Sequence, residues 1–349
     1  PPSGCNFAKT NSSVLQSEPA KVVKPEPEPL MIGSLSPTIE TARRPSPRSS
    51  RQSVPLYLIL FVQQSGCTMQ SWHIGEVKIQ RVVEFEGPLL DPFTIYPVAD
   101  EATLQRHKSW LQPRLQEPGT GLLILSFHTF VIRTPHHVIL VDTCGGNDKQ
   151  RPQKPRYHMN NWPYLENLSA AGIQVDDVDF VLCTHLHVDH VGWNTRLVDG
   201  RWVPTFPNAK YLFAKDEWAF WEEEYKTERY NDDPYYEDSI LPVIEAGSAV
   251  MVDGDHTIDD WVRLAATPGH TPGHVCVHID SGSSHAVMSG DLMHHPLQCA
   301  EPDWSSCFCV DPTASARTRR EFLANHADTP TLVMPAHFAT PGAGKIIKS

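Results

Sequence analysis

The amino-acid sequence predicts an α/β fold in which short buried strands alternate with helices. The chain has 349 residues, 40% of them hydrophobic, so it is long enough to bury a sizeable core. Residues 180–183 form a short continuous apolar segment, which is typical of a strand covered on both faces. Polar side chains of metal-binding type repeatedly follow such segments, and ligands of layered α/β folds collect beyond strand ends. These observations favour a strand-rich α/β protein with its functional site beyond those ends.

The remaining elements follow from local patterns along the chain. Apolar and polar residues alternate over 72–79, which indicates a strand. Segments 122–133 and 137–141 are predicted to pair as a hairpin, because Thr134, Pro135 and His136 offer a turn between them. Further strands are predicted at residues 180–183, 210–214, 262–266, 274–280, 286–289 and 331–335, and helices at residues 162–171, 216–225 and 314–326.

Residues 1–68 differ in composition from the rest of the chain. They contain ten of the 31 prolines, many serines and no aspartate. Seven Lys and Arg against four Glu give this segment a charge of +3, which leaves −15 for the remainder of the total of −12. Such a composition cannot build a core. We therefore interpret residues 1–68 as a disordered Pro/Ser-rich N-terminal extension and residues 69–349 as the folded domain.

One apolar run, residues 54–62, interrupts the extension. Nine residues are too few to span a bilayer, but they suit the apolar region of a signal peptide. Residues 43–67 would then act as a signal, with a weak lipoprotein-like cleavage site before Cys67, and the protein would be secreted or lipid-anchored. We favour the alternative that Met69 is the natural start, which predicts a cytoplasmic protein without a membrane span.

Charge and cysteine usage exclude several classes of function. The net charge of −12 gives no attraction for phosphate backbones or anionic lipid, so we expect no nucleic-acid partner. The eight cysteines lack the dense spacing of a disulfide scaffold, and free buried thiols are expected. Cys307 and Cys309 would share one face of a strand and could chelate a metal, but nothing nearby in the sequence completes a ligand set.

The strongest chemical signal is THLHVDH, residues 184–190, directly after the apolar segment 180–183. Three imidazoles and a carboxylate within six residues are costly to pack unless they bind something. In an extended turn, His185 and His187 point the same way and can hold one ion, while Asp189 and His190 turn toward a second. Imidazole and carboxylate are usual ligands of zinc and its neighbours. A solvated histidine-rich loop is disfavoured, because it would need no preceding apolar strand.

The pattern HxHxDH after a strand resembles the metallo-β-lactamase superfamily, and the resemblance covers about residues 73–345. It implies that the first histidine of TPGHTPGH (267–274) is a ligand and that His274 supports the loop. The motifs SGD (289–291) and PAH (335–337) match a carboxylate that bridges two metals and the final ligand. The resemblance thus implies two divalent metal ions, expected to be Zn²⁺, and seven ligands: His185, His187, Asp189, His190, His270, Asp291 and His337.

The same resemblance implies a four-layer αββα metallo-β-lactamase fold and a hydrolase mechanism. Two ions that share a carboxylate and a water lower the pKa of that water toward roughly 7, which provides a bridging hydroxide as nucleophile. The second ion would polarise the carbonyl or phosphoryl oxygen, and Asp189 would pass the proton. Asp142, at the end of the predicted strand 137–141, matches an early VDT element that is structural in the family. No GxSxG elbow is present for a serine mechanism.

The implied substrate depends on residues near Asp291. A bridging carboxylate favours the lactonase, thioesterase and phosphotriesterase branches over true β-lactamases. Residues 290–295 and the wide spacing from Asp291 to His337 resemble the group of acyl-homoserine lactone lactonases and methyl parathion hydrolase most. Lactonases of that group often bind the lactone oxygen with a tyrosine three residues after the bridging aspartate, where this chain has His294. We expect an imidazole to donate the same hydrogen bond, so the predicted activity is hydrolysis of a lactone or carboxyl ester, with Asp189, Asp291 and His294 as catalytic residues.

Other interpretations stay open on the sequence alone. A phosphotriesterase or aryl-ester hydrolase of the same fold is the first alternative, and an iron-dependent redox protein with a similar ligand set is the second. Trp193 and Trp304 could line a wall for the substrate or pack in the core. The aromatic stretch 218–236 could be a homodimer surface or a lid over the site. The expected partner is a small-molecule ester or lactone.

Overall fold

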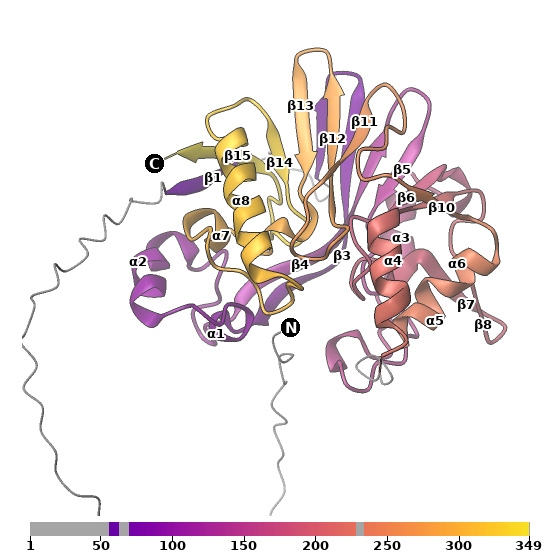
Figure 1. Cartoon of the computed structure of the whole chain (residues 1–349), viewed down its shortest axis with the longest axis horizontal. Coiled ribbons are helices and arrows are strands. Elements are labelled where there is room, and N and C mark those ends of the chain that lie inside the picture. Colours follow the sequence, from indigo (N-terminus) through magenta and orange to yellow (C-terminus); the bar gives the residue numbers. More distant parts are fainter. Residues whose placement is uncertain (1–55, 63–69, 228–233, 349) are drawn as a thin grey trace, which may run out of the picture. The chain divides into compact units, whose positions relative to one another are not determined.

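The computed structural model describes residues 56–62, 70–227 and 234–348, and most of its strands lie in two large sheets (Figure 1). The six-stranded sheet has the order β1 (Tyr57–Phe61), β15 (Gly344–Lys348), β14 (Leu332–Met334), β13 (Ser284–Met288), β12 (Val275–Ser281), β11 (Val262–Ala266). The seven-stranded sheet has the order β10 (Ala249–Val252), β9 (Lys210–Ala214), β6 (Phe180–Leu182), β5 (Val138–Val141), β4 (Leu123–Arg133), β3 (Val77–Leu90), β2 (Ser71–Ile74). A small hairpin, β7 (Thr195–Val198) and β8 (Arg201–Pro204), stands apart from both.

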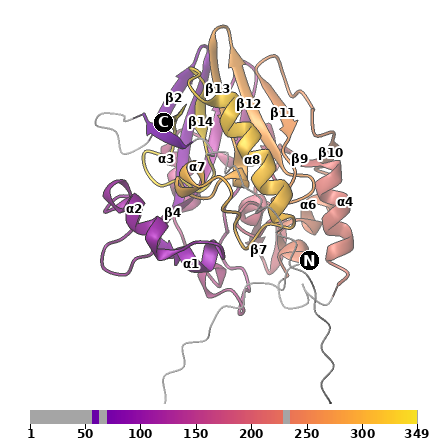
Figure 2. The ribbon, with the colours of Figure 1, turned by 60° about the vertical axis from the view of Figure 1, so that its left-hand side comes forward.

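The two large sheets pack face to face, and helices cover their outer faces. Side chains alternate along a strand, so Ile139 and Val141 of β5 join Val277 of β12 in the core between the sheets, while Leu140 points outward. The outer face of the seven-stranded sheet is covered by α3 (Tyr164–Ala170), α4 (Lys215–Glu224), α5 (Tyr235–Ser239) and α6 (Leu241–Glu245). On the six-stranded sheet, Cys276 packs outward in a core with α7 (Leu297–Ala300) and α8 (Pro312–His326), and Figure 2 shows α8 running alongside β12 and β13. The predicted four-layer αββα fold is confirmed.

Most of the predicted elements are present, with shifts of one or two residues at their ends. The hairpin of β4 and β5 is antiparallel and pairs Phe130 with Val141. Strands β9 and β11 have the predicted bounds. Helix α8 starts at Pro312, two residues before the predicted start, because the Asp311 carboxylate caps it by accepting from the N–H groups of Thr313 and Ala314. Five α-helices of the described residues were not predicted: α1 (Pro92–Ile95), α2 (Glu101–Leu111), α5, α6 and α7. Both Figures 1 and 2 show α1 and α2 at the end of the molecule away from the β12–β13 turn.

The prediction of disorder through residue 68 is wrong for Tyr57–Phe61, which forms β1. This strand pairs antiparallel with β15, near the other end of the chain, and Tyr57 is buried in the core under α8. Local composition could not reveal a partner so distant in sequence. Residues 1–55 and 63–69, including Cys67 and Met69, lie outside the described residues, and a chain that began at Met69 would lack β1. No helix in residues 56–62, 70–227 and 234–348 combines the length and apolar character needed to cross a membrane.

The topology brings the predicted ligand motifs to one edge of the sandwich. Strands β5, β6 and β9 are parallel, so the segments after Val141 and Leu182 leave the sheet on the same side. Strands β13 and β14 are also parallel, and the motifs at 289–291 and 335–337 follow them directly. The motif at 267–274 precedes β12, which is antiparallel to β13 and therefore starts at that same edge. Segments far apart in the sequence thus meet around one point.

Candidate metal centre

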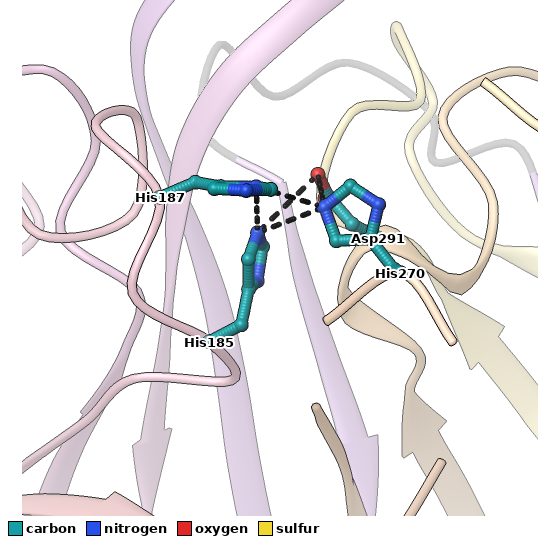
Figure 3. A group of neighbouring side chains, drawn as sticks. All are labelled: His185, His187, His270 and Asp291. Atoms are coloured by element: carbon teal, nitrogen blue, oxygen red, sulfur yellow. Dashed lines mark hydrogen bonds and ion pairs between the residues drawn. The ribbon is translucent and has the colours of Figure 1, made fainter. Parts of the chain in front are cut away.

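All seven predicted ligands lie together at this edge, in two groups. In the first group, His185, His187, His270 and Asp291 point toward one another (Figure 3). His185 Nε2 is 2.9 Å from His187 Nδ1 and 3.1 Å from His270 Nε2. His270 Nε2 is 2.9 Å from His187 Nδ1 and 3.2 Å from Asp291 Oδ2. Four potential ligand atoms therefore surround one small space.

The second group comprises Asp189, His190 and His337, and Asp291 reaches it as well. The Nε2 atoms of His190 and His337 are 3.2 Å apart. Each is 3.8 Å from a carboxylate oxygen of Asp189. Asp291 Oδ1 lies 3.3 Å from His190 Nε2 and 2.9 Å from His337 Nε2. The two oxygens of Asp291 thus face different groups, which is the geometry of a bridging carboxylate.

The geometry of both groups fits bound divalent ions. Tetrahedral zinc with bonds of about 2.0–2.1 Å places its ligand atoms roughly 3.3 Å apart, close to the separations seen here. Asp291 Oδ1 is buried and makes no hydrogen bond within the described part of the chain. A buried carboxylate oxygen without a donor is costly unless a cation compensates it. The donor set of imidazoles and carboxylates is also the one that zinc prefers.

Hydrogen bonds on the far side of the rings orient the histidines. The Asp142 carboxylate lies 2.9 Å from His190 Nδ1 and also accepts from the backbone N–H and hydroxyl of Thr184, as expected for a structural residue. The carbonyl oxygen of Ser126 lies 3.0 Å from His337 Nδ1. Such partners fix the ring orientation and leave the opposite nitrogen free for a metal.

Burial and charge act differently on the imidazoles. Burial lowers the pKa of His185 and of His187, so both rings are neutral and able to donate a lone pair. Burial also opposes protonation of His190, but the carboxylates of Asp291 and Asp142 outweigh it and raise the pKa of this imidazole. The carboxylates of Asp291 and Asp142 therefore favour positive charge at His190.

Two glycines of the TPGHTPGH segment allow helix backbones to approach it closely. A Cβ on Gly269, whose φ is +137°, would lie 2.2 Å from the backbone nitrogen of Ser315 in α8. A Cβ on Gly273 would lie 2.0 Å from the backbone nitrogen of Glu217 in α4. His274, the last residue of this segment, accepts from the Asp291 N–H through Nε2 and contacts Thr267 Oγ1 through Nδ1. With both nitrogens engaged, His274 has the predicted supporting role.

Glu217 of α4 joins the two ligand loops, and the sequence did not single it out. Its carboxylate is buried and accepts from the backbone N–H groups of Leu186 at 2.9 Å and Gly273 at 3.1 Å. It also accepts from Trp221 Nε1 at 2.7 Å. Burial raises its pKa. In sequence, Glu217 is one acidic residue in the first turn of a helix, and nothing local distinguishes it from its neighbours.

His294 lies against the Asp291 carboxylate, which faces both groups of ligands. Its Nε2 is 3.2 Å from Asp291 Oδ2, and its ring stacks on that of His337 with the centroids 5.7 Å apart. Burial lowers the pKa of His294 to about 4, and the nearby imidazole of His270 acts in the same direction. The ring is therefore neutral at pH 7 and carries a single N–H. His294 Nδ1 makes no hydrogen bond with other described residues.

Tyr157 is a second residue at the centre that the sequence did not indicate. It comes from a short 3₁₀ helix, Pro155–Tyr157, and its hydroxyl donates to Asp189 Oδ2 at 3.1 Å. Its ring packs on Phe127, with the centroids 5.6 Å apart. Burial and the Asp189 carboxylate raise the pKa of Tyr157, so the phenol keeps its proton and acts as a donor. No sequence motif indicates this contact, because Tyr157 and Asp189 are 32 residues apart.

The two tryptophans considered at the sequence level belong to the core. Trp193 stacks on Tyr164 with the centroids 5.2 Å apart, and its Nε1 donates to Glu84 at 2.7 Å. Glu84 also accepts from the N–H groups of Gly145 and Gly146, and burial raises its pKa to about 7. Trp304 is buried beside Tyr96. Both tryptophans therefore pack in the core, and Trp193 also borders a surface cleft.

The aromatic stretch 218–236 packs largely on itself. Trp221 and Tyr235 are buried in the core over the seven-stranded sheet. Trp218 stacks on Tyr236 with the centroids 5.8 Å apart. Residues 228–233 lie outside the described residues, and the alternatives of a dimer surface and a lid stay open.

Comparison with known proteins agrees with the fold and the position of the ligand motifs. The model of the metallo-beta-lactamase superfamily matches residues 128–337, which is more than half of the chain and includes all seven ligand positions. The chain belongs to the metallo-β-lactamase superfamily. The family predicted from HxHxDH is thereby confirmed, and the four-layer sandwich described above is the fold that this superfamily member adopts.

Relatives of this superfamily member include acyl-homoserine lactonases. It is 29% identical over 123 residues to an N-acyl homoserine lactonase of Bacillus thuringiensis, a match that covers 35% of this chain and 40% of that protein. A lactonase of Bacillus cereus is 27% identical over 121 residues, with the same coverage. The matched segment thus spans less than half the length of these curated relatives.

Solved structures resemble it over most of its length. The hydrolase AbOPH of the beta-lactamase superfamily has a TM-score of 0.67 at 24% identity, and the match covers 82% of this chain and 95% of that one. AidC, a dizinc quorum-quenching lactonase, has a TM-score of 0.63 at 21% identity, with 80% and 96% covered. At these identities the likeness shows the fold.

Proposed function

We propose that this protein is a dinuclear metal-dependent hydrolase that opens a lactone or a related carboxyl ester. The observation that carries the proposal is the arrangement of Asp291, whose two oxygens face separate groups of histidine and aspartate ligands. The similarity to acyl-homoserine lactonases supports the choice of substrate class. We assign this activity to a domain that begins by Tyr57, earlier than the predicted residue 69, because β1 belongs to its sheet.

The proposed ions would be held by His185, His187 and His270 on one side and by Asp189, His190 and His337 on the other, with Asp291 shared. Two divalent ions bound there, zinc in our proposal, would supply an electrophile for the carbonyl oxygen and would lower the pKa of water enough to provide a nucleophile near pH 7.

The chain's own residues would orient the reaction around this pair of ions. Asp189 accepts a hydrogen bond from the Tyr157 hydroxyl, and in this proposal it would pass a proton to the leaving oxygen. In the proposed mechanism His294, which is neutral, stands where lactonases of the resembling group often have a tyrosine, and its N–H would hydrogen bond to the substrate oxygen.

A second candidate, hydrolysis of an aryl ester or phosphotriester, is favoured by a row of aromatic rings beside the second group. Phe127 lies 5.5 Å from the His337 ring, Phe85 lies 6.0 Å from Phe127, and Trp162 lies 5.6 Å from Phe85. Trp162 also lines a surface cleft of about 390 Å³. These rings meet at tilted or edge-on angles, and in this second candidate the half-buried Phe85 and Trp162 would pack against a planar aryl group.

Metal content and hydrolysis, measured together, test the proposal. Purified protein would be analysed by mass spectrometry for metals and assayed on an acyl-homoserine lactone, a p-nitrophenyl ester and a phosphotriester, with and without chelator. About two zinc ions per chain and chelator-sensitive lactone opening are expected. Faster turnover of the aryl substrates would select the second candidate. Iron without hydrolysis would replace both with the redox alternative, and protein that binds no metal would refute the dinuclear centre.

A further inference from the structure

We propose that Cys309 is a positioning residue for His270. Its sulfur accepts the Nδ1 proton of His270 and thereby keeps Nε2 free to face the first ion. The proposal rests on the proposed dinuclear function, and it concerns a residue that the metal motifs do not include. It also gives a role to the Cys307-Phe308-Cys309 segment, which the sequence suggested as a possible chelator.

The backbone fixes Cys309 behind the His270 ring. Its Sγ lies 3.6 Å from His270 Nδ1, on the side of the ring opposite to the other ligands. The next two residues anchor the segment: the Val310 N–H donates to the His270 carbonyl at 2.8 Å, and the Asp311 N–H donates to the Gly269 carbonyl at 3.0 Å. The contact between sulfur and imidazole is therefore built into the pairing of two backbone segments.

The neighbours of the sulfur favour its role as an acceptor. The hydroxyls of Ser306 and Ser315 each lie 3.4 Å from Cys309 Sγ. The Ser315 hydroxyl oxygen accepts from Arg319 Nη1 at 3.3 Å, and the Cys309 thiol donates to the same oxygen. Arg319 is itself buried and donates to the carbonyls of Leu292 and Pro302, so this arrangement is rigid. Because the thiol proton is directed at Ser315, the sulfur lone pairs are available to accept the Nδ1 proton of His270.

The opposite direction of this hydrogen bond would be incompatible with the proposed centre. If the thiol donated to His270 Nδ1, the neutral ring would carry its proton on Nε2. That proton would point at His185 Nε2, 3.1 Å away, and at His187 Nδ1, 2.9 Å away, where a cation belongs. A sulfur acceptor therefore selects the tautomer in which Nε2 has a free lone pair.

The hydrogen-bond partners of the other histidine ligands indicate why metal binding by His270 should be sensitive to the loss of Cys309. His190 is backed by the carboxylate of Asp142 and His337 by a main-chain carbonyl, and both are strong acceptors. Sulfur is a weaker acceptor than either. Neither candidate metal group in the described residues includes a cysteine, so Cys309 acts through His270 rather than on a metal.

The test uses the full chain with Cys309→Ala, Cys309→Ser and a matched control, Cys299→Ala. Cys299 is also fully buried, but its Sγ contacts the Met293 thioether at 3.6 Å and no ligand. Zinc affinity would be measured by chelator competition, and the tautomer of His270 by long-range ¹⁵N–¹H correlation on histidine-labelled protein. Loss of such a supporting partner typically weakens metal binding by about 10–100-fold. We expect about a 10-fold loss for one of the two ions in Cys309→Ala, with wild-type affinity in the control and recovery in Cys309→Ser.

The outcomes separate this inference from the proposed function. Wild-type protein that binds two zinc ions and carries the His270 proton on Nδ1, together with the selective loss in Cys309→Ala, would support it. Unchanged affinity and unchanged ¹⁵N shifts in that variant, with two ions in the wild type, would overturn the positioning role alone. An Nε2 proton on His270 in the wild type would overturn it even if the variants failed to fold. An equal loss in Cys299→Ala would show a general packing effect instead, and wild-type protein without metal would remove both proposals.

Discussion

Replacing Glu217 by glutamine should loosen the two ligand loops without changing a ligand. The carboxylate uses Oε1 for the Leu186 N–H and for Trp221 Nε1, and Oε2 for the Gly273 N–H. Glutamine has the same shape but a single acceptor oxygen. In either orientation of the amide, at least one of these buried donors loses its partner and faces an N–H₂ group.

The size of the effect follows from two opposing contributions. A buried donor left without a partner costs about 1–3 kcal/mol. Burial of the Glu217 carboxylate is itself unfavourable, as the raised pKa shows, and the neutral amide avoids that cost. The smaller loss occurs when the amide oxygen occupies the Oε1 position, which sacrifices only the bond to Gly273. We expect a net loss of about 1–2 kcal/mol in the free energy of unfolding.

Urea denaturation of metal-free protein at pH 7.5 measures this change, beside the loss of zinc during dialysis. Glu222→Gln is the matched control, because Glu222 is exposed on the same helix and its replacement should stay within about 0.5 kcal/mol of wild type. The variant should also release zinc faster than wild type, since both loops carry ligands. A variant as stable as wild type would refute the reasoning, because charge burial would then outweigh the three hydrogen bonds.

Three further changes test other contacts. Tyr157→Phe removes the donor to Asp189 and should lower kcat/KM about 10-fold, the equivalent of a hydrogen bond to a charged group, with zinc content unchanged in mass spectrometry. Burial raises the pKa of Glu84 from 4.5 to about 7 in the folded state, so its contribution to the free energy of unfolding should fall by about 3 kcal/mol as pH rises from 4.5 to 7. In urea denaturation at several pH values, Glu84→Gln should lack this part of the wild-type pH dependence. Gly273→Ala forces a Cβ to within 2.0 Å of the Glu217 backbone and should cost at least about 2 kcal/mol, whereas wild-type thermal stability in this variant would contradict the packing.

Much of the fold could be predicted because its strands carry their burial in local sequence. The continuous apolar segment at β6 identified a strand that is covered on both faces, as expected. The alternation over 72–79 indicated strand, but a turn at Gly75 and Glu76 divides that segment into the antiparallel pair β2 and β3. The prediction failed for β1, because its five residues lie beside a proline-rich segment and pair only with β15, at the other end of the chain. Short helices such as α1 were missed for a similar reason: four residues are less than two turns and leave almost no periodic pattern.

The sequence alone determined the superfamily and the residues of the candidate centre. Short contiguous motifs contain the ligand residues, and each motif directly follows or precedes a strand that can be predicted locally. The tertiary structure decided how those motifs combine: that Asp291 faces both groups, that Tyr157 reaches Asp189, and that Cys309 lies behind His270. These contacts join segments separated by tens to hundreds of residues. Their geometry depends on strand order, on the register between strands and on the close approach of helices to loops, and none of these is encoded in a local pattern.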